Sequence, residues 1–221
     1  MNLYKVFSVM MGFTKSLYLN FRYLNFRDAI KFPIVVSHKV FIRNSKGKVI
    51  INSQVKTGMI KIGFGYVGTV DERKERTILE LDGIVVFNGK CSIGSGSKIC
   101  VMNGELSLGD NVHITANSTV ICGKRIIIGN NSLISWDNLI MDTDFHKIKD
   151  INGNIINSDK DITIGKNVWI GCRCTILKGS RIGDYAVVAA NTNLHSEIDG
   201  TNQVVGGNPV RVLKENIYWC V

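Results

Sequence analysis

One histidine of this chain lies in a setting that suits general acid–base chemistry. His146 stands near the start of a polar segment, residues 141–161, that interrupts an otherwise apolar pattern. Because imidazole titrates near neutrality, it can accept a proton from a hydroxyl and then return it to a thiolate. Asp142 and Asp144 are the nearest carboxylates in sequence, and either of them, or a backbone carbonyl, could hold one ring nitrogen so that the other presents its lone pair. A second interpretation is that His146 is an ordinary loop residue.

The polar segment interrupts a repeat with a period of six residues. The aliphatic or aromatic positions of the repeat are Leu81, Phe87, Ile93, Ile99, Leu108, Ile114, Val120, Ile126, Ile128, Ile134, Ile140, Ile164, Ile170, Ile176, Ile182, Val188 and Leu194, with two short slips in the earlier part. A long strand has a period of two and a helix a period of 3.6, so neither fits. Short strands of a parallel β-helix do fit, with three flat sides to each coil and each of these side chains pointing to the axis.

Neighbouring positions favour the same architecture. Gly or Ala follows the aliphatic residue in four of the last six units, where it would ease the corner of the coil. The fifth position is small or β-branched in most of these units, as at Ala186 and Thr192, which predicts packing against the coil above. The same position explains Cys91 and Cys174 as packing residues rather than redox or metal groups. Because an outgrowth from a monotonous coil commonly carries the binding face, we expect the site near residues 141–161.

Residues 1–50 lie outside the repeat and are predicted to form an N-terminal helical segment. The stretch from Leu3 to Phe26 alternates apolar and aromatic residues with Lys5, Lys15, Arg22 and Arg27, which is compatible with an amphipathic helix. This helix could cap the open end of the coil, where strand edges would otherwise invite aggregation, or it could make a peripheral contact with an anionic membrane. Residues 51–212 are then the β-helix domain, and residues 213–221 are a C-terminal tail.

Composition and charge narrow the class of protein. The 221 residues have room for one medium domain rather than two. The net charge of +9 suits any polyanion, but no segment resembles a nucleic-acid-binding module, so we expect no nucleic-acid partner. Six cysteines without framework spacing, and no secretion signal, favour a reduced cytoplasmic protein, with the inner face of the membrane as a further option. Lys15 interrupts the apolar stretch near the N-terminus, so we expect no membrane-spanning helix.

Three stretches of the chain resemble the hexapeptide-repeat acyltransferases. They are M-D-T-D-F-H at 141–146, V-W-I-G…I-L-K-G at 168–179 and G-G-N-P-V-R-V at 206–212. The resemblance extends from about Leu81 to Val212. The family includes the maltose and galactoside acetyltransferases and the O-acetyltransferases of bacterial surface polysaccharides. It implies an all-β, left-handed parallel β-helix, with acetyl-CoA bound between neighbouring subunits of a homotrimer. The handedness comes from the family alone, because a period of six does not fix it.

The resemblance also implies roles for single residues near the outgrowth. His146 matches the catalytic base, which takes the proton of a sugar hydroxyl as its oxygen attacks the acetyl thioester, with no acyl-enzyme and no metal. Asp144 is the expected partner of His146, and Asp142 is expected to contact the acceptor. Trp169 precedes an inward residue, so it should point outward beside the outgrowth. There it could serve as a platform for the sugar or the pantetheine arm, or lie under the loop.

Acetyl-CoA is expected to run along the later coils. The residues that match the family's cofactor contacts are Gly171, Ala189, Ala190, Asn208, Pro209 and Arg211. Arg211 stands in place of the lysine of the family's N-P-A-K turn. The chain departs from the family at Leu194 and His195, where relatives often carry a lysine, and it stays open whether His195 substitutes for it. His38 and His113 are expected to be structural or exposed.

Other functions remain open on the sequence. An N-acetyltransferase of an amino-sugar nucleotide is one, although residues 1–80 show no sugar-nucleotide domain. A γ-type carbonic anhydrase shares the β-helix but holds zinc through three histidines, and only His113 and His146 lie in suitable regions. A non-catalytic β-helix scaffold is a third. The sequence therefore favours an acetyl-CoA-dependent O-acetyltransferase of a sugar hydroxyl, in a surface polysaccharide or its precursor.

Overall fold

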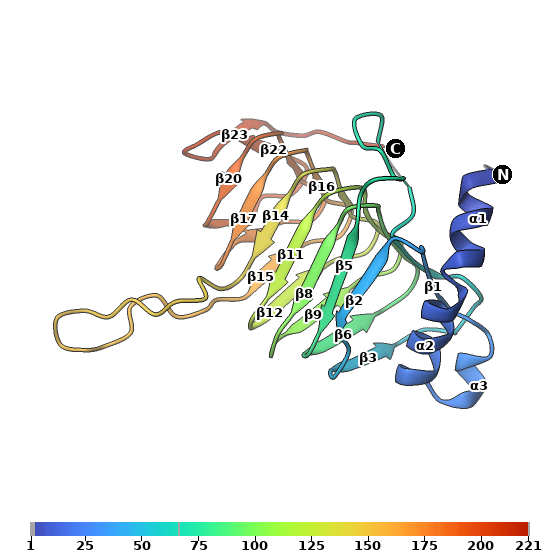
Figure 1. Cartoon of the computed structure of the whole chain (residues 1–221). Helices are drawn as coiled ribbons and strands as arrows, with labels where there is room; N and C mark the ends of the chain where they lie inside the picture. The colour runs from blue at the N-terminus through green and yellow to red at the C-terminus, as the bar shows by residue number, and fades with distance from the viewer. Residues whose placement is uncertain (1–2, 66, 221) are drawn as a thin grey trace.

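A computed structural model describes residues 3–65 and 67–220, and its strands wind into a three-sided coil (Figure 1). Each side of the coil is one sheet, and strands one full coil apart pair in parallel within it. The fold is a left-handed parallel β-helix, so the predicted fold class is confirmed.

The three sheets take their strands in turn along the chain. Sheet A contains β1 (Ile34–Val36), β4 (Ile60–Ile62), β7 (Cys91–Ile93), β10 (Val112–Ile114), β13 (Leu133–Ile134), β16 (Trp169–Ile170), β19 (Val187–Val188), β22 (Val204–Gly206) and β23 (Arg211–Lys214). Sheet B contains β2 (Val40–Asn44), β5 (Thr77–Leu81), β8 (Lys98–Val101), β11 (Thr119–Cys122), β14 (Leu139–Met141), β17 (Thr175–Leu177) and β20 (Asn193–Leu194). Sheet C contains β3 (Lys48–Ile51), β6 (Ile84–Phe87), β9 (Glu105–Leu108), β12 (Arg125–Ile128), β15 (Ile162–Ile164), β18 (Arg181–Ile182) and β21 (Glu197–Ile198). The last strand, β23, pairs antiparallel with β22.

The six-residue spacing exists because one side chain per strand must point to the axis. Every apolar position named in the repeat is buried, from Leu81 at 6 % exposed to Leu194 at 0 %. The fifth positions are buried as well, including Cys174 and Thr192, which confirms their predicted packing role. At the corners the backbone takes a left-handed φ at residues such as Asn131 and Asn167, a conformation that asparagine tolerates better than most residues do.

The slips in the repeat fall at one corner, between sheets B and C. Elsewhere along the regular coils, consecutive inward residues stay six apart, as at 93 to 99 and 108 to 114. From sheet B to sheet C the spacing widens to nine residues at 99 to 108, to eight at 120 to 128, and to 24 at 140 to 164. The polar segment is therefore the largest of three outgrowths stacked at the same corner. Figure 1 shows it projecting far from the coil, between β14 and β15.

The β-helix begins earlier than the sequence predicted. The boundary at residue 50 is wrong, because β1, β2 and β3 already form a coil and pair in parallel with β4, β5 and β6. A long connection between β3 and β4, residues 52–59, hides the six-residue period there. The predicted helical segment is confirmed, as α1 (Leu3–Met11), α2 (Phe13–Tyr23) and α3 (Phe26–Ala29).

The helices cap the first end of the coil, as one of the two interpretations predicted. In α2, the Ser16 hydroxyl accepts a hydrogen bond from Val36 N (3.0 Å). The Asn20 side chain accepts from Ile34 N (3.1 Å) and donates to Ile34 O (2.7 Å). Side chains of a helix thus satisfy the edge of β1, which would otherwise present unpaired backbone groups.

Candidate functional site

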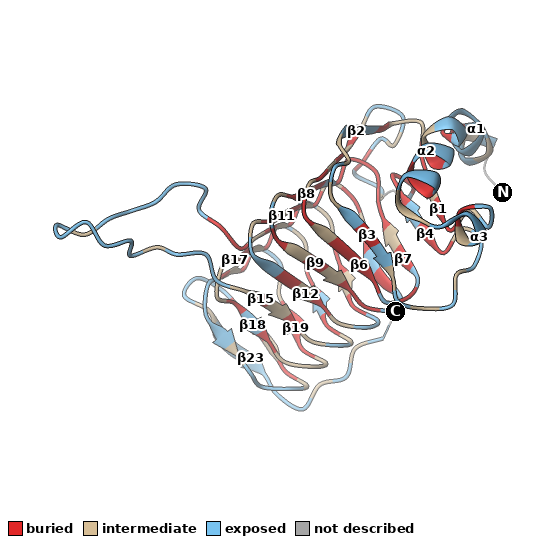
Figure 2. Cartoon of the chain, turned by 90° about the horizontal axis from the view of Figure 1, so that it is seen from below, coloured by how far each residue is buried: buried red, intermediate tan, exposed pale blue. Residues whose placement is uncertain are grey.

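The outgrowth, which we call the arm and define as residues 142–161, carries His146 on its first half. Its two halves run antiparallel, with a bridge between Lys149 and Ile155 and a hydrogen bond from Ile156 N to Ile148 O (2.9 Å). Figure 2 shows almost the whole arm exposed. The arm is therefore a hairpin-like extension that makes most of its own hydrogen bonds and stands clear of the coil.

Asp142 anchors the arm to the coil below. Its carboxylate is 0 % exposed and accepts hydrogen bonds from the backbone N–H groups of Gly123 (2.6 Å), Lys124 (2.9 Å) and Arg125 (2.7 Å). These groups form the neighbouring corner between sheets B and C. The predicted contact between Asp142 and the acceptor does not fit this position, because the carboxylate is buried and its oxygens already face three donors. Asp142 is a structural residue of the corner.

A second set of polar contacts, which we call the clasp, consists of Asp144, Asn157 and Lys178. The Lys178 ammonium donates to the Asp144 carboxylate (2.5 Å) and to the backbone oxygen of Asn157 (2.6 Å). The Asn157 amide donates to the Asp144 carboxylate (2.8 Å) and to the backbone oxygen of His146 (2.8 Å). The hydrogen bond from Lys178, and next that from Asn157, hold the pKa of Asp144 below its ordinary value. The clasp closes the base of the arm.

The clasp changes the role expected of Asp144. Within the described part of the chain, no hydrogen bond joins the Asp144 carboxylate to the His146 ring, since the carboxylate faces Lys178 and Asn157. Asp144 and Asn157 instead fix the backbone on which His146 is carried, and His146 N donates to Asp144 O (2.6 Å). The imidazole itself is exposed. The sequence reasoning missed Asn157 and Lys178, although Lys178 lies in the I-L-K-G stretch.

A groove of about 690 Å³ lies beside the base of the arm. Its lining includes Arg125, Lys160, Asp161, Lys178, Arg181, His195 and Glu197. Three of its four cations are already paired with carboxylates, Arg125 with Glu105, Lys178 with Asp144 and Arg181 with Asp199, so the groove is mixed in charge. His195 is exposed here, on the last regular coil.

The residues predicted to bind the cofactor gather at a different corner, between sheets A and B. Gly171 N donates to Val188 O (2.8 Å), and Ala189 N donates to Val205 O (2.8 Å), so successive coils stack there. A Cβ atom at Gly171 would lie 2.7 Å from Ala190 N, so stacking alone already requires glycine. We call this row of small residues the ladder, with Gly171, Ala189 and Ala190 as its members.

The remaining predicted cofactor residues continue the ladder. Asn208 and Pro209 lie in the exposed turn between β22 and β23, and Arg211 begins β23. The backbone of Gly206 packs closely against Ala189. A Cβ atom added at Gly206 would lie only 2.8 Å from the Ala189 Cβ. The structure therefore brings all six predicted cofactor residues to one edge of the molecule.

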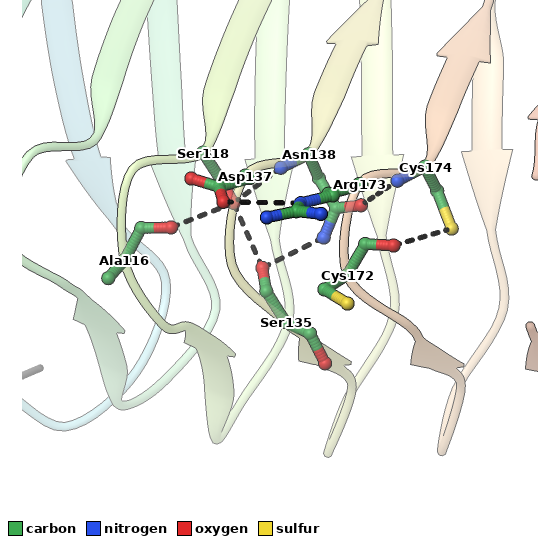
Figure 3. Close-up of polar contacts among 8 residues, drawn as sticks. All are labelled: Ala116, Ser118, Ser135, Asp137, Asn138, Cys172, Arg173 and Cys174. Atoms are coloured by element: carbon green, nitrogen blue, oxygen red, sulfur yellow. Dashed lines mark hydrogen bonds and ion pairs between the residues drawn. The ribbon is translucent and has the colours of Figure 1, made fainter. Parts of the chain in front are cut away.

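Polar side chains hold the same corner rigid one coil earlier (Figure 3). The Asn138 amide is buried, accepts from Cys174 N (2.7 Å) and donates to Ser135 O (2.8 Å). The Ser118 hydroxyl donates to Ser135 O (2.9 Å). Because these buried groups are satisfied, the corner is a stiff support for whatever binds outside it.

Trp169 points outward, as predicted, but it does not lie beside the arm. It is 38 % exposed on β16 of sheet A, and its indole N–H donates to the Ser135 hydroxyl (3.0 Å). The ring of Trp219, from the C-terminal tail, lies 6.0 Å away, and its indole donates to Asn167 O (2.6 Å). The arm leaves from the corner between sheets B and C, whereas β16 starts after the next corner. Trp169 therefore adjoins the ladder.

His146 and the ladder lie at opposite ends of the strands of sheet B. The arm leaves after β14 at one end of these strands, and Gly171 precedes β17 at the other. A single chain thus separates the groups that the sequence assigns to proton transfer and to acetyl-CoA.

His38 and His113 lie apart from the arm, whereas His195 lines the groove beside its base. His38 is partly buried under the cap, with Nδ1 3.0 Å from the Ser8 hydroxyl, and burial lowers its pKa. His113 is exposed on β10, with Nε2 3.1 Å from the Asn111 side-chain oxygen. Among residues 3–65 and 67–220, no three His, Cys, Asp or Glu side chains come together as a metal site would need. None of the helices described is both long enough and apolar enough to cross a bilayer.

Comparison with known proteins adds to this geometry. The family described as bacterial transferase hexapeptide (six repeats) matches residues 161–196. The chain is 35 % identical to the polysialic acid O-acetyltransferase of Neisseria meningitidis over 60 % of its own length and 57 % of that protein's, so it spans little more than half of that relative. It is 31 % identical to YJL218W of Saccharomyces cerevisiae, a protein named only as a candidate acetyltransferase, over 66 % of this chain and 72 % of that one.

A solved structure is similar as well. The hexapeptide-repeat-containing acetyltransferase VCA0836 of Vibrio cholerae, complexed with acetyl coenzyme A, matches with a TM-score of 0.51 and 27 % identity. The match covers 59 % of this chain and 70 % of that one.

Proposed function

Because this chain belongs to the bacterial transferase hexapeptide family, we propose that it is an O-acetyltransferase that moves the acetyl group of acetyl-CoA to a sugar hydroxyl. The observation that carries the proposal is the exposed imidazole of His146, whose backbone the clasp holds at the base of the arm. The acceptor is a surface polysaccharide or its precursor. The similarity to a polysialic acid O-acetyltransferase supports this class of acceptor.

The reaction is a direct transfer in a ternary complex. His146 takes the proton of the hydroxyl while the hydroxyl oxygen attacks the thioester carbonyl. A tetrahedral oxyanion forms and is stabilised by backbone N–H groups of the coil. As the carbon–sulfur bond breaks, the imidazolium returns its proton to the sulfur, and CoA leaves as a thiol. No metal takes part in these steps.

The active enzyme is a homotrimer whose sites lie between subunits. The separation of His146 from the ladder supports this arrangement, because an arm can reach the ladder of a neighbour without spanning its own sheet B. Ile148, Ile151 and Ile156 on the arm are 56 %, 101 % and 63 % exposed, and a neighbouring subunit would cover such apolar side chains. Each site would then combine the arm of one subunit with the ladder of the next.

The ladder gives acetyl-CoA a narrow edge along which to lie. Small residues at Gly171, Ala189 and Ala190 allow the pantetheine arm to approach the backbone. Arg211 is exposed at the start of β23, where it can meet a phosphate of the nucleotide. Trp169 offers an aromatic face next to the ladder for pantetheine or sugar.

We place the enzyme in the cytoplasm. All six cysteines are free, which suits a compartment where thiols stay reduced.

The test of the base is the release of CoA by purified protein with a panel of acidic and neutral oligosaccharides. His146→Ala should lower kcat by about 10²- to 10⁴-fold, because general-base catalysis is lost, while acetyl-CoA affinity and the oligomer mass stay unchanged. His113→Ala is the matched control, since His113 is also exposed but lies on sheet A. If the His146 variant kept more than about half of the wild-type rate, the assignment of the base would be wrong.

The shared site is tested by mixing two inactive variants. Ala190→Tyr should block the ladder, because the larger side chain fills the exposed edge, and His146→Ala removes the base. A site is intact only where the Ala190→Tyr subunit supplies the arm and the His146→Ala subunit supplies the ladder. Random trimers made from equal amounts of the two variants should therefore regain about a quarter of the wild-type activity. Sites contained within one subunit would give no recovery.

A further inference from the structure

The helices of the cap turn several polar side chains toward the coil, beside the buried Leu19 of α2. A surface helix normally turns its apolar side to the core and its polar side to water. Here Ser8, Ser16 and Asn20 are 2 %, 3 % and 0 % exposed and face the coil. The Ser8 hydroxyl bonds to the Ser37 hydroxyl, just after the edge strand β1. Ser16 and Asn20 bond to the backbone of Val36 and Ile34 within β1. The polar side of these helices is therefore already used inside the protein.

The opposite side of the cap is a broad exposed apolar surface, which we call the cap face. Its members are Leu3 (87 % exposed), Phe7 (50 %), Met10 (71 %), Met11 (58 %), Phe13 (52 %), Leu17 (39 %), Tyr18 (48 %), Phe21 (44 %), Phe26 (70 %) and Ile30 (52 %). Figure 2 shows these helices with their buried sides toward the coil and their exposed sides outward. Residues three and four apart share a helix face, so Phe7 and Met10 stand side by side, as do Leu17 and Phe21. An apolar surface of this extent marks an interaction site.

The helices cannot turn this face inward. A Cβ atom at Gly12, between α1 and α2, would lie 2.1 Å from Val36 O and 3.0 Å from His38 N. The chain therefore presses directly onto the edge strand at this point. Lys15 adds two hydrogen bonds, from its ammonium to His38 O (2.7 Å) and Val40 O (2.7 Å). The orientation of the cap is fixed from within, and the apolar side remains on the outside.

Charge around the cap face selects the kind of partner. Residues 1–40 contain six basic side chains, Lys5, Lys15, Arg22, Arg27, Lys31 and Lys39, and one acidic side chain, Asp28. That carboxylate is itself paired with Lys31 at 2.9 Å. Arg22 lines a shallow hollow of the cap face together with Leu17, Tyr18 and Phe21. Lys15 points inward to His38 O and Val40 O, but Arg22 borders the apolar side chains, as cations do in helices that lie in the headgroup layer of a membrane.

We propose that the cap face docks onto a phospholipid bilayer that contains anionic lipids. Its apolar side chains would enter the boundary between headgroups and acyl chains, and the bordering cations would meet lipid phosphates. A second copy of the same face is a poorer partner, because self-pairing would bring two basic surfaces together. This docking is independent of the proposed transfer chemistry, since the cap lies at the first end of the coil and the arm leaves it several coils later (Figure 1).

The test is co-sedimentation of the full chain with vesicles of phosphatidylcholine alone or mixed with phosphatidylglycerol. The wild type should bind the mixed vesicles and lose binding as salt is raised. The double variant Phe7→Glu, Met10→Glu should bind at least about tenfold more weakly, because two exposed apolar side chains no longer enter the lipid. Arg22→Glu, Arg27→Glu should weaken binding to the mixed vesicles and abolish its salt dependence. Tyr218→Glu, which changes an even more exposed aromatic residue on the tail, should leave binding unchanged.

The outcomes separate the occupants of the cap face. Failure of the wild type to bind mixed vesicles, or equal binding by the Phe7 and Met10 variant, would overturn the proposal. A change of oligomer mass in that variant, measured by light scattering, would show instead that the face joins two copies, and would also overturn it. Both variants change exposed residues, so circular dichroism should report wild-type folding. Acetyl transfer to a soluble acceptor should persist in them, which distinguishes a failure here from a failure of the proposed function.

Discussion

Replacing Asp142 by asparagine would show whether this carboxylate holds a corner or contacts a ligand. One carboxylate oxygen accepts from Gly123 N, and the other accepts from Lys124 N and Arg125 N, at 2.6 to 2.9 Å. Asparagine keeps one acceptor oxygen, but its NH₂ group must face a backbone donor. The variant loses one charge-assisted hydrogen bond, of about 1.5–3 kcal/mol, and weakens the other two. Since the corner is partly exposed and water can satisfy some of the loss, we expect a total of about 2–4 kcal/mol.

Thermal unfolding followed by far-ultraviolet circular dichroism, at matched protein concentration, measures this loss. A loss of this size should lower Tm by roughly 5–12 °C in a chain of this length. Asp144→Asn is the matched control, because it changes an exposed carboxylate of the same arm and should cost no more than about 1 kcal/mol. An Asp142→Asn protein with the Tm of the wild type and a raised KM for the acceptor would refute the structural reasoning and restore the ligand role.

Two further predictions concern titratable groups. The pKa of Asp144 is lowered chiefly by the hydrogen bond from Lys178. The clasp therefore stabilises the arm fully at pH values above the ordinary aspartate pKa of 3.8, and this stabilisation is lost as the pH falls through the lower pKa of Asp144 in the folded protein. A ¹³C titration should place its midpoint below 3.8, and Lys178→Met should move it back upward, whereas an unchanged midpoint would argue against the contact. For the thiols, Cys220 is exposed, while Cys91 is buried with its pKa raised to about 12. Cys220 should react at once with a disulfide reagent in the native protein and Cys91 only after unfolding, so rapid labelling of Cys91 would contradict its packing role.

The sequence by itself determined the architecture and pointed to the arm. Each unit of six residues must place one apolar side chain on the axis, and the same requirement returns in every unit. The pattern can therefore be read along the chain, and the six apolar repeat positions from Ile164 to Leu194 are buried as predicted. His146 was found because the arm breaks this pattern. The start of the β-helix was missed, since the long connection before β4 masks the period.

Only the tertiary structure decided which groups meet. Asp144 and Lys178 are 34 residues apart, and they touch because the coil returns the chain to the same corner after the arm. Asp142 is buried for the same reason, since it reaches the backbone of the preceding coil. Trp169 lies next to the ladder because each unit turns the chain onto another side. Which residues of successive coils lie against each other depends on how many residues each corner holds. Because the outgrowths differ in length, this alignment of the coils cannot be read from the six-residue pattern.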